Sequence, residues 1–347
     1  MTLTCAWCGQ VITEGSGKGL ITHGICSICA RDNFDVRVGF DSLLPRPGSD
    51  PARIALRQQL IAVLESQGEL LPAPDSPLQH LWTLVNSEKA TVDQCVDLIE
   101  LDPALAARVF RYANSASAGR PADTIAQAVL HLGFTRLRQV IFNAGIFEQL
   151  SRFDVPPGWE QFWTRNLFVA RLTERLAAAY FTPDGSEYLA GLLHDTGWLF
   201  LYNFFPEQFD LIQNSGRPLH ETEKKVLPFT HGHISAAISA RSFLPLRVVN
   251  AVTYHSTPLP AEIESGSTPL KSPRFLAVLI HLADRLADDS GLALFNQHQI
   301  TPTELRPEAR WLQQFGPLPD LAALAAKELP ATLELSSIFF AQPLRAA

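Results

Sequence analysis

Beyond residue 40, apolar residues recur at the three- and four-residue spacing of amphipathic helices, and no segment shows the convincing two-residue alternation of a half-buried strand. In the segment 51–67 the apolar positions form one helical face: Ile54, Leu56, Leu60, Ile61, Val63 and Leu64. Further helices are expected over 77–86, 92–101, 103–113, 124–132 and 136–147. The body of the chain is therefore predicted to be all-α.

Several residues stand where helices are expected to begin or end. Thr91 and Asp102 can each cap the helix that follows, and Pro103 suits a first helical position because its missing N–H is not needed there. Gly133 can end one helix and Thr135 can cap the next. We expect a proline-rich linker over 41–50. We also expect a helical tail from residue 291 that packs on the bundle, with breaks at its prolines: Pro302, Pro307, Pro317 and Pro330.

Cysteine spacing sets the N-terminus apart. Four of the five cysteines form two C-x2-C pairs separated by 17 residues: Cys5, Cys8, Cys26 and Cys29. Each pair can direct two thiolates at one ion, and two pairs complete a tetrahedral zinc site. Short strands are expected over 11–13 and 20–22, and so small a segment needs the metal in order to fold. The sequence therefore predicts a zinc-ribbon-like module over residues 1–40, with one structural zinc ion.

Two other interpretations of this module are a redox switch and a nucleic-acid-binding ribbon. Residues 1–40 hold three basic and three acidic side chains, and this net charge of zero argues against the nucleic-acid-binding interpretation. The stretch 22–26 resembles the second knuckle of small zinc ribbons appended to bacterial signalling proteins. The fifth cysteine, Cys95, lies among apolar residues at helical spacing and is expected in the core.

Composition narrows the class of protein. A length of 347 residues suggests two or three domains. The net charge of −7 and the lack of a strongly basic segment disfavour a nucleic-acid partner. No apolar run reaches the roughly 18–20 residues that a membrane span needs. Residues 1–5 lack the features of a signal peptide, so we expect a cytoplasmic protein.

The most informative motif is the adjacent pair His194-Asp195, which lies between two apolar runs. A charged group in such surroundings costs several kcal/mol unless it is paired, neutralised or bound to a metal. The pair therefore indicates either a metal or catalytic site or a buried structural link.

Three segments resemble the signature of the HDOD domain, the HD-related output domain: 96–116, 125–138 and 190–197. The resemblance extends over 69–289. It implies an N-terminal helical subdomain (69–150) on a bundle (151–289) related to HD phosphohydrolases, with a linker and helix (41–68) before it and a helical extension (290–347) after it. It also implies a role in bacterial signal transduction as an output or scaffold module.

The resemblance assigns the HD-site positions one by one. His194 and Asp195 match the doublet, His233 and His255 match the next two histidines, and Asp284 matches the final carboxylate. In an HD phosphohydrolase these groups hold a divalent ion that activates water and offsets phosphoryl charge. Arg165 stands where the family places its first histidine.

That arginine changes the expected chemistry. A guanidinium carries only donors and cannot ligate a cation. We expect Arg165 to pair with Asp195 or Asp284 in place of the ion, although the remaining residues could still form a partial site for a second metal. His231 is expected on the surface, and His281 is expected to orient Asp284.

The sequence leaves three functions open. The leading one is a non-catalytic signalling module that binds a protein partner or a small ligand. The alternative is a metal-dependent phosphohydrolase acting on a nucleotide or cyclic dinucleotide, in which Arg165 would clamp a phosphate. A zinc-ribbon regulator of nucleic acid is disfavoured by charge. The metal ions bound per chain distinguish the signalling module, which needs zinc alone, from the phosphohydrolase, which needs a second metal.

Overall fold

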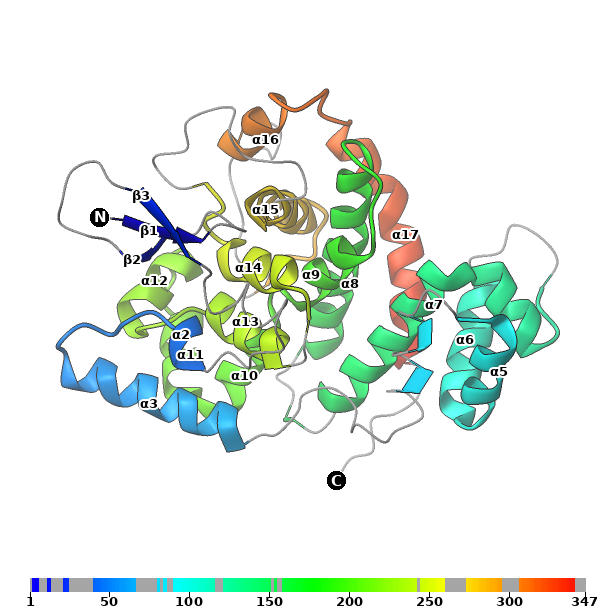
Figure 1. Ribbon diagram of the computed structural model, residues 1–347, viewed down its shortest axis with the longest axis horizontal. Coiled ribbons are helices and arrows are strands. Elements are labelled where there is room, and N and C mark those ends of the chain that lie inside the picture. Colours follow the sequence, from blue (N-terminus) through cyan, green and yellow to red (C-terminus); the bar gives the residue numbers. More distant parts are fainter. Residues whose placement is uncertain are drawn as a thin grey trace.

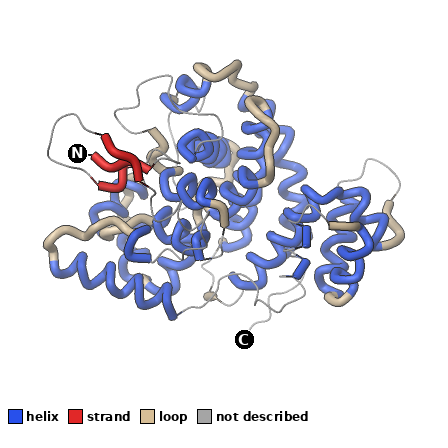
Figure 2. Tube along the Cα trace, in the orientation of Figure 1, coloured by secondary structure: helices blue, strands red, loops and turns tan. Residues whose placement is uncertain are grey.

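The computed structural model describes residues 2–5, 11–13, 21–24, 40–66, 80–81, 84–85, 90–115, 121–150, 153–154, 158–241, 244–259, 273–294 and 306–340. After residue 40, every element in this part of the chain is a helix, which confirms the all-α prediction for the body (Figures 1 and 2). No helix in the same part of the chain combines the length and apolarity needed to cross a bilayer.

Three helices form the N-terminal lobe: α5 (Val92–Glu100), α6 (Pro103–Ser115) and α7 (Ile125–Leu150). Thr91 caps α5 as predicted, because it accepts from the Gln94 backbone while the Gln94 side chain accepts from the Thr91 N–H. Asp102 likewise accepts from the Leu105 N–H at 3.1 Å. Gly133 has φ 66° and ψ 167° and interrupts α7, so the two predicted helices appear as one kinked helix.

Eight helices form the bundle: α8 (Trp159–Ala178), α9 (Ser186–Leu193), α10 (Thr196–Phe204), α11 (Pro206–Gln213), α12 (Leu219–Val226), α13 (His231–Arg241), α14 (Leu246–Tyr254) and α15 (Pro273–Asp289). Helix α8 packs on α9 and α15, and α14 packs on α13 and α15. Large apolar side chains fill the space between them; Trp163, Phe168 and Phe275 are fully buried. Each such side chain contributes roughly 1.5–3 kcal/mol.

Helices α16 (Pro307–Leu312) and α17 (Leu321–Phe340) follow the bundle. As predicted, the tail packs on the body: α17 runs along α8 and also contacts α6 of the N-terminal lobe (Figure 1). The predicted break at Pro330 is wrong, because α17 continues through this residue. Glu328 and Leu335, buried on either side of it, offset the ~3 kcal/mol cost of a proline inside a helix.

The N-terminus contains a sheet of three strands, β1 (Thr2–Cys5), β2 (Val11–Thr13) and β3 (Ile21–Gly24), in the order β2-β1-β3. Strand β1 pairs antiparallel to β2 and parallel to β3. Strands β2 and β3 overlap the two predicted strands, whereas β1 was not predicted. Cys8, Cys26 and Cys29 lie outside the described residues, so the zinc module stays a prediction.

Two elements occupy the region predicted as linker and helix. Helix α2 (Phe40–Leu43) begins it, and α3 (Pro51–Ser66) matches the predicted helix over 51–67. Leu44, between them, is buried in the core, whereas residues 46 and 48–50 of the proline-rich stretch are exposed. Of the helix predicted over 77–86, the structure describes only residues 80–81 and 84–85. Cys95 is buried in the core, as expected.

Candidate functional site

The His-Asp doublet lies at the turn between α9 and α10, and two nearby glycines allow the backbones of neighbouring helices to approach it closely. A Cβ on Gly191 would lie 2.7 Å from the Ala170 Cα of α8. A Cβ on Gly197 would overlap the His231 carbonyl oxygen at the start of α13. Only glycine permits these two backbone approaches, which bring His194 and Asp195 against neighbouring helices.

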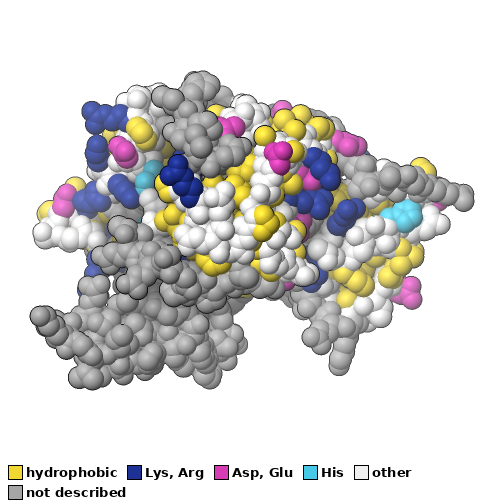
Figure 3. All heavy atoms as spheres, turned by 90° about the horizontal axis from the view of Figure 1, so that it is seen from above, with side chains coloured by type: hydrophobic (Ala, Val, Ile, Leu, Met, Phe, Trp, Pro, Cys, Tyr) yellow, Lys and Arg dark blue, Asp and Glu magenta, His cyan; other side chains and the backbone are white. Residues whose placement is uncertain are grey.

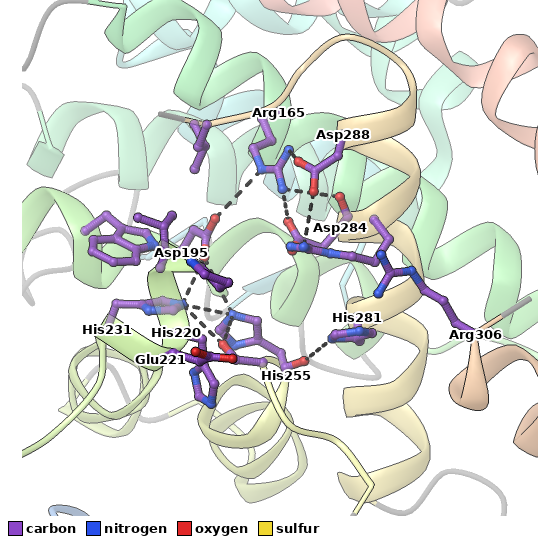
Figure 4. Close-up of a pocket in the computed structure, with 16 residues that line it drawn as sticks. Arg165, Asp195, His220, Glu221, His231, His255, His281, Asp284, Asp288 and Arg306 are labelled. Carbon is purple, nitrogen blue, oxygen red and sulfur yellow. Dashed lines mark hydrogen bonds and ion pairs between the residues drawn. The ribbon is translucent and has the colours of Figure 1, made fainter. Parts of the chain in front are cut away.

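Five elements supply the side chains of the site (Figure 4). Arg165 comes from α8, the doublet from the α9–α10 turn, His231 from α13, His255 from the end of α14, and Asp284 and Asp288 from α15. Each of these side chains is at most 7% exposed. The structure thus brings together five of the six predicted HD-site residues: Arg165, His194, Asp195, His255 and Asp284.

Arg165 is the centre of an ion-pair network. Its Nη2 lies 2.5 Å from Asp284 Oδ1 and its Nη1 lies 2.8 Å from Asp288 Oδ1. Its Nε is 3.9 Å from Asp195 Oδ2. Burial opposes the charged form, but Asp284, Asp288 and Asp195 together raise the pKa of Arg165 above its ordinary value. The expected pairing of Arg165 with Asp284 is therefore confirmed.

His194 is a second cation in the site. Its Nδ1 donates to the Gly191 carbonyl at 2.7 Å, so the other ring nitrogen faces the carboxylates. That Nε2 lies 3.3 Å from Asp195 and 3.2 Å from Asp284. Burial lowers the pKa of His194, but these two carboxylates outweigh it and raise the pKa to about 9. At neutral pH both ring nitrogens are therefore donors, and a metal could bind Nε2 only by displacing its proton.

His231 connects the doublet to α12. Its Nδ1 lies 2.9 Å from Glu223 Oε2 and its Nε2 lies 3.3 Å from Asp195 Oδ1, while its ring stacks on Trp198. Burial opposes protonation, but Glu223 and Asp195 raise the pKa of His231 to about 10. The protonated ring bridges the two carboxylates, one on each nitrogen.

His255 stays neutral beside it. Its Nδ1 donates to the Val252 carbonyl at 2.7 Å, and its Nε2 lies 3.1 Å from His231 Nε2 and 3.6 Å from Asp195 Oδ1. Burial lowers the pKa of His255, outweighing its contact with Asp195, and the charge of His231 lowers it further. The free lone pair on its Nε2 can therefore accept from His231.

Three histidine predictions are corrected by the structure. His233 lies outside the site, because its Nδ1 contacts the Thr230 backbone N–H at 3.2 Å and the Thr230 hydroxyl at 2.7 Å. His231, expected on the surface, is 5% exposed and occupies the site instead. The two lie two residues apart in one helix, about 200° around its axis, so only one can face the doublet. His281 donates to the His255 carbonyl at 2.9 Å rather than orienting Asp284.

Sequence reasoning missed three members of the network: Asp288, Glu223 and Arg285, which pairs with Asp284 and Asp288. Asp288 is four residues after Asp284, so the helical spacing that places both on one face of α15 could have identified it. Glu223 comes from the polar helix α12, where its neighbours gave no sign that it would be fully buried. It reaches the site only through the packing of α12.

The residues present do not fit a divalent cation in this arrangement. His194, Asp195 and His255 do offer three ligand atoms within 4.8 Å of one another. However, the charges around them already balance: Asp195, Glu223, Asp284 and Asp288 face Arg165, Arg285, His194 and His231. With both histidines protonated, an added ion would leave two uncompensated positive charges in a buried site, at a cost of several kcal/mol, so it would first have to displace protons from them.

A small cavity of ≈ 260 Å³ borders this network (Figure 4). Its lining includes three residues outside the network, His220, His281 and Arg306, and three of the network, Asp195, His231 and His255. Burial lowers the pKa of His220 and of His281, each to about 3, so both are neutral. The cavity approaches the lower end of the volumes that hold small ligands, roughly 300–1,000 Å³.

Comparison with known families decides the classification. Residues 71–258 match the HDOD domain, and this range is more than half of the chain. The chain belongs to the HDOD family. An uncharacterized protein of Treponema pallidum (strain Nichols) is 23% identical over 245 residues, which are 67% of this chain and 47% of that protein. The HDOD chain thus spans about half the length of the curated relative it matches.

Solved structures share the HDOD fold. An HDOD domain protein of unknown function from Geobacter sulfurreducens is 23% identical with a TM-score of 0.64, covering 82% of this chain and 98% of that one. A Shewanella amazonensis SB2B protein provisionally assigned as a phosphohydrolase is 24% identical, with a TM-score of 0.59 and coverages of 81% and 96%. A Marinobacter aquaeolei VT8 protein provisionally assigned to signal transduction is 24% identical, with a TM-score of 0.58 and coverages of 88% and 68%. At these identities the likeness establishes the fold alone.

Proposed function

We propose that this HDOD chain is a non-catalytic signal-transduction module that acts by binding a protein partner or a small ligand. The observation that carries the proposal is Arg165, whose guanidinium is bonded to Asp284 and Asp288 inside the HD site. Phosphoryl hydrolysis at such a site needs an ion to activate water. Arg165 and protonated His194 instead occupy the carboxylates that would hold it, and the site acts as a structural link between α8, α10 and α15.

One face of the surface and one relative support a protein as the partner. On the face shown in Figure 3, Lys and Arg side chains lie in small groups among acidic and hydrophobic ones. A nucleic-acid footprint would be a continuous basic stripe, so we favour a signalling protein. The Marinobacter relative, provisionally assigned to signal transduction, supports the same choice.

Metal content tests the proposal. Full-length protein incubated with Mn²⁺, Fe²⁺ or Mg²⁺ and then desalted is expected to retain one zinc per chain, held by the four N-terminal cysteines, and no stoichiometric second metal. It is also expected not to hydrolyse bis-p-nitrophenyl phosphate. A second metal at one equivalent, with turnover that disappears in Asp195→Ala, would overturn the proposal.

The second candidate is a metal-dependent phosphohydrolase acting on a nucleotide or cyclic dinucleotide. Two features favour it: the ligand atoms of His194, Asp195 and His255 lie within 4.8 Å of one another, and an adjoining cavity is lined by Arg285 and Arg306. Arg165→His separates the candidates, because it restores a ligand and removes a fixed charge. If Arg165 excludes the ion, Arg165→His gains Mn²⁺ while wild type and Arg165→Lys do not. Equal Mn²⁺ uptake by all three proteins would favour the phosphohydrolase.

A further inference from the structure

A second cavity, of ≈ 490 Å³, lies where the N-terminal lobe meets the bundle. Its walls come from the second half of α7, from the loop before α9 and from the start of α14. No residue that lines it also lines the cavity beside Arg165. Its volume lies within the roughly 300–1,000 Å³ typical of sites for small organic ligands.

The lining of this junction cavity combines an apolar wall with two guanidinium groups and the carboxylate of Asp184, which pairs with Arg247 at 3.4 Å. Leu189, Leu244 and Pro245 form the apolar part, and Arg138 and Arg247 contribute guanidinium groups. A mostly apolar cavity with a few convergent polar groups is the usual form of a small-molecule site, because the apolar wall supplies affinity and the charges supply orientation.

Arg247 is held in place before any ligand arrives. Its Nη2 donates to the fully buried Glu187 at 2.6 Å, and its Nη1 donates to the Ser186 hydroxyl at 2.7 Å. Its guanidinium also lies 5.4 Å from the centre of the Phe181 ring. The remaining Nε is buried and has no hydrogen-bond partner among the described residues. A fixed guanidinium loses little conformational entropy when a ligand binds.

Arg138 provides the charge that is still available. Its side chain is half-buried, and its contact within the lobe is a long one, 3.4 Å from Nη2 to the Thr135 hydroxyl. Within the described part of the chain, no ion pair joins Arg138 to a carboxylate, in contrast to Arg247, which pairs with Glu187 and Asp184. Arg138 can therefore form a charge-assisted hydrogen bond with an incoming anion.

We propose that the junction cavity binds a small organic anion, with its apolar or aromatic body on Leu189, Leu244 and Pro245 and its anionic group on Arg138. Because this cavity shares no residue with the HD site, the proposal stands or falls independently of the role of Arg165. A ligand bound here touches both α7 of the N-terminal lobe and α9 and α14 of the bundle, so it would connect the two lobes.

Two fluorescent probes with the same aromatic body test the charge requirement. Anilinonaphthalene sulfonate carries an anionic group, and phenylnaphthylamine lacks it. The full-length protein is expected to bind the sulfonate about tenfold more tightly, because only the sulfonate can form a charge-assisted hydrogen bond with Arg138. Arg138→Gln should remove this preference and Arg138→Lys should retain part of it. Leu189→Trp, which fills the cavity, should weaken binding of both probes.

Arg136→Gln is the matched control, because Arg136 lies on the same helix and lines a different cavity. It is expected to keep the wild-type preference. Thermal melts of every variant show which proteins remain folded. Equal affinity of the wild type for both probes, or a sulfonate preference that survives in folded Arg138→Gln, would overturn the proposal.

Discussion

Replacing Arg165 with methionine is expected to destabilise the bundle strongly. The change removes the guanidinium that lies 2.5 Å from Asp284 and 2.8 Å from Asp288, while both carboxylates stay buried. Breaking a buried ion pair by deleting one partner costs roughly 3–5 kcal/mol, because the other charge is left uncompensated. With an unfolding entropy of about 0.7 kcal/mol/K for a chain of this length, Tm should fall by about 4–7 °C.

Urea denaturation followed by circular dichroism measures this cost, and a double-mutant cycle assigns it to the pair. Asp284→Asn in the Arg165→Met background should cost less than the sum of the two single changes, by about 1 kcal/mol or more. Arg175→Met is the comparison variant, because Arg175 is 48% exposed in its ion pair with Glu328. Arg175→Met should lower the free energy of unfolding by clearly less than Arg165→Met does. Additive effects of the Arg165 and Asp284 changes, or a loss below about 1 kcal/mol for Arg165→Met, would refute the charge argument.

Three further predictions concern pH, the C-terminal helix and the doublet. The pKa values of His194 and His231 are raised to about 9 and about 10 in the folded protein. Protonation of these two rings therefore stabilises the folded state fully below the unfolded pKa of about 6.5, and this contribution is lost as pH rises through 9–10. Stability should therefore fall across this range, and a slope unchanged in His231→Gln would contradict the assignment. Glu328→Gln removes the carboxylate that pairs with Arg171 and Arg175, and should cost about 2 kcal/mol in urea, less than a fully buried pair because Arg175 is half exposed. Gly197→Ala places a Cβ against the His231 carbonyl and should cost about 1–3 kcal/mol in the same assay; a neutral result would mean that α10 and α13 are not closely packed.

The helices could be predicted because their signals are local. The capping box at Thr91 and the break at Gly133 depend on a few neighbouring residues, and both appear in the structure. Pro330 shows the limit of such signals, because the packing of α17 on α8 overrides a local helix breaker.

The site could be predicted only in part. The resemblance to the HDOD signature placed Arg165 at the HD site, and its charge then predicted a pair with Asp195 or Asp284, of which the structure forms the Asp284 pair at 2.5 Å. The choice between His231 and His233 depends on the rotation of α13 about its axis, which the sequence does not specify. Glu223 enters because the chain between α12 and α13 folds back and brings it to His231, eight residues later, and no helical periodicity predicts that contact.

Glu328 has a consequence for where the folding unit ends. It lies on α17, beyond residues 71–258 that match the HDOD domain, yet its carboxylate is buried between Arg171 and Arg175 of α8. Ser336 of the same helix contacts Thr164 of α8 at 2.5 Å. A chain cut after α15 would therefore expose this face of α8 and leave Arg171 and Arg175 without the carboxylate with which they pair. The match to the HDOD domain ends at residue 258, before both α15 and α17, so a fragment cut there would also lose Asp284 and Asp288, and we expect it to aggregate.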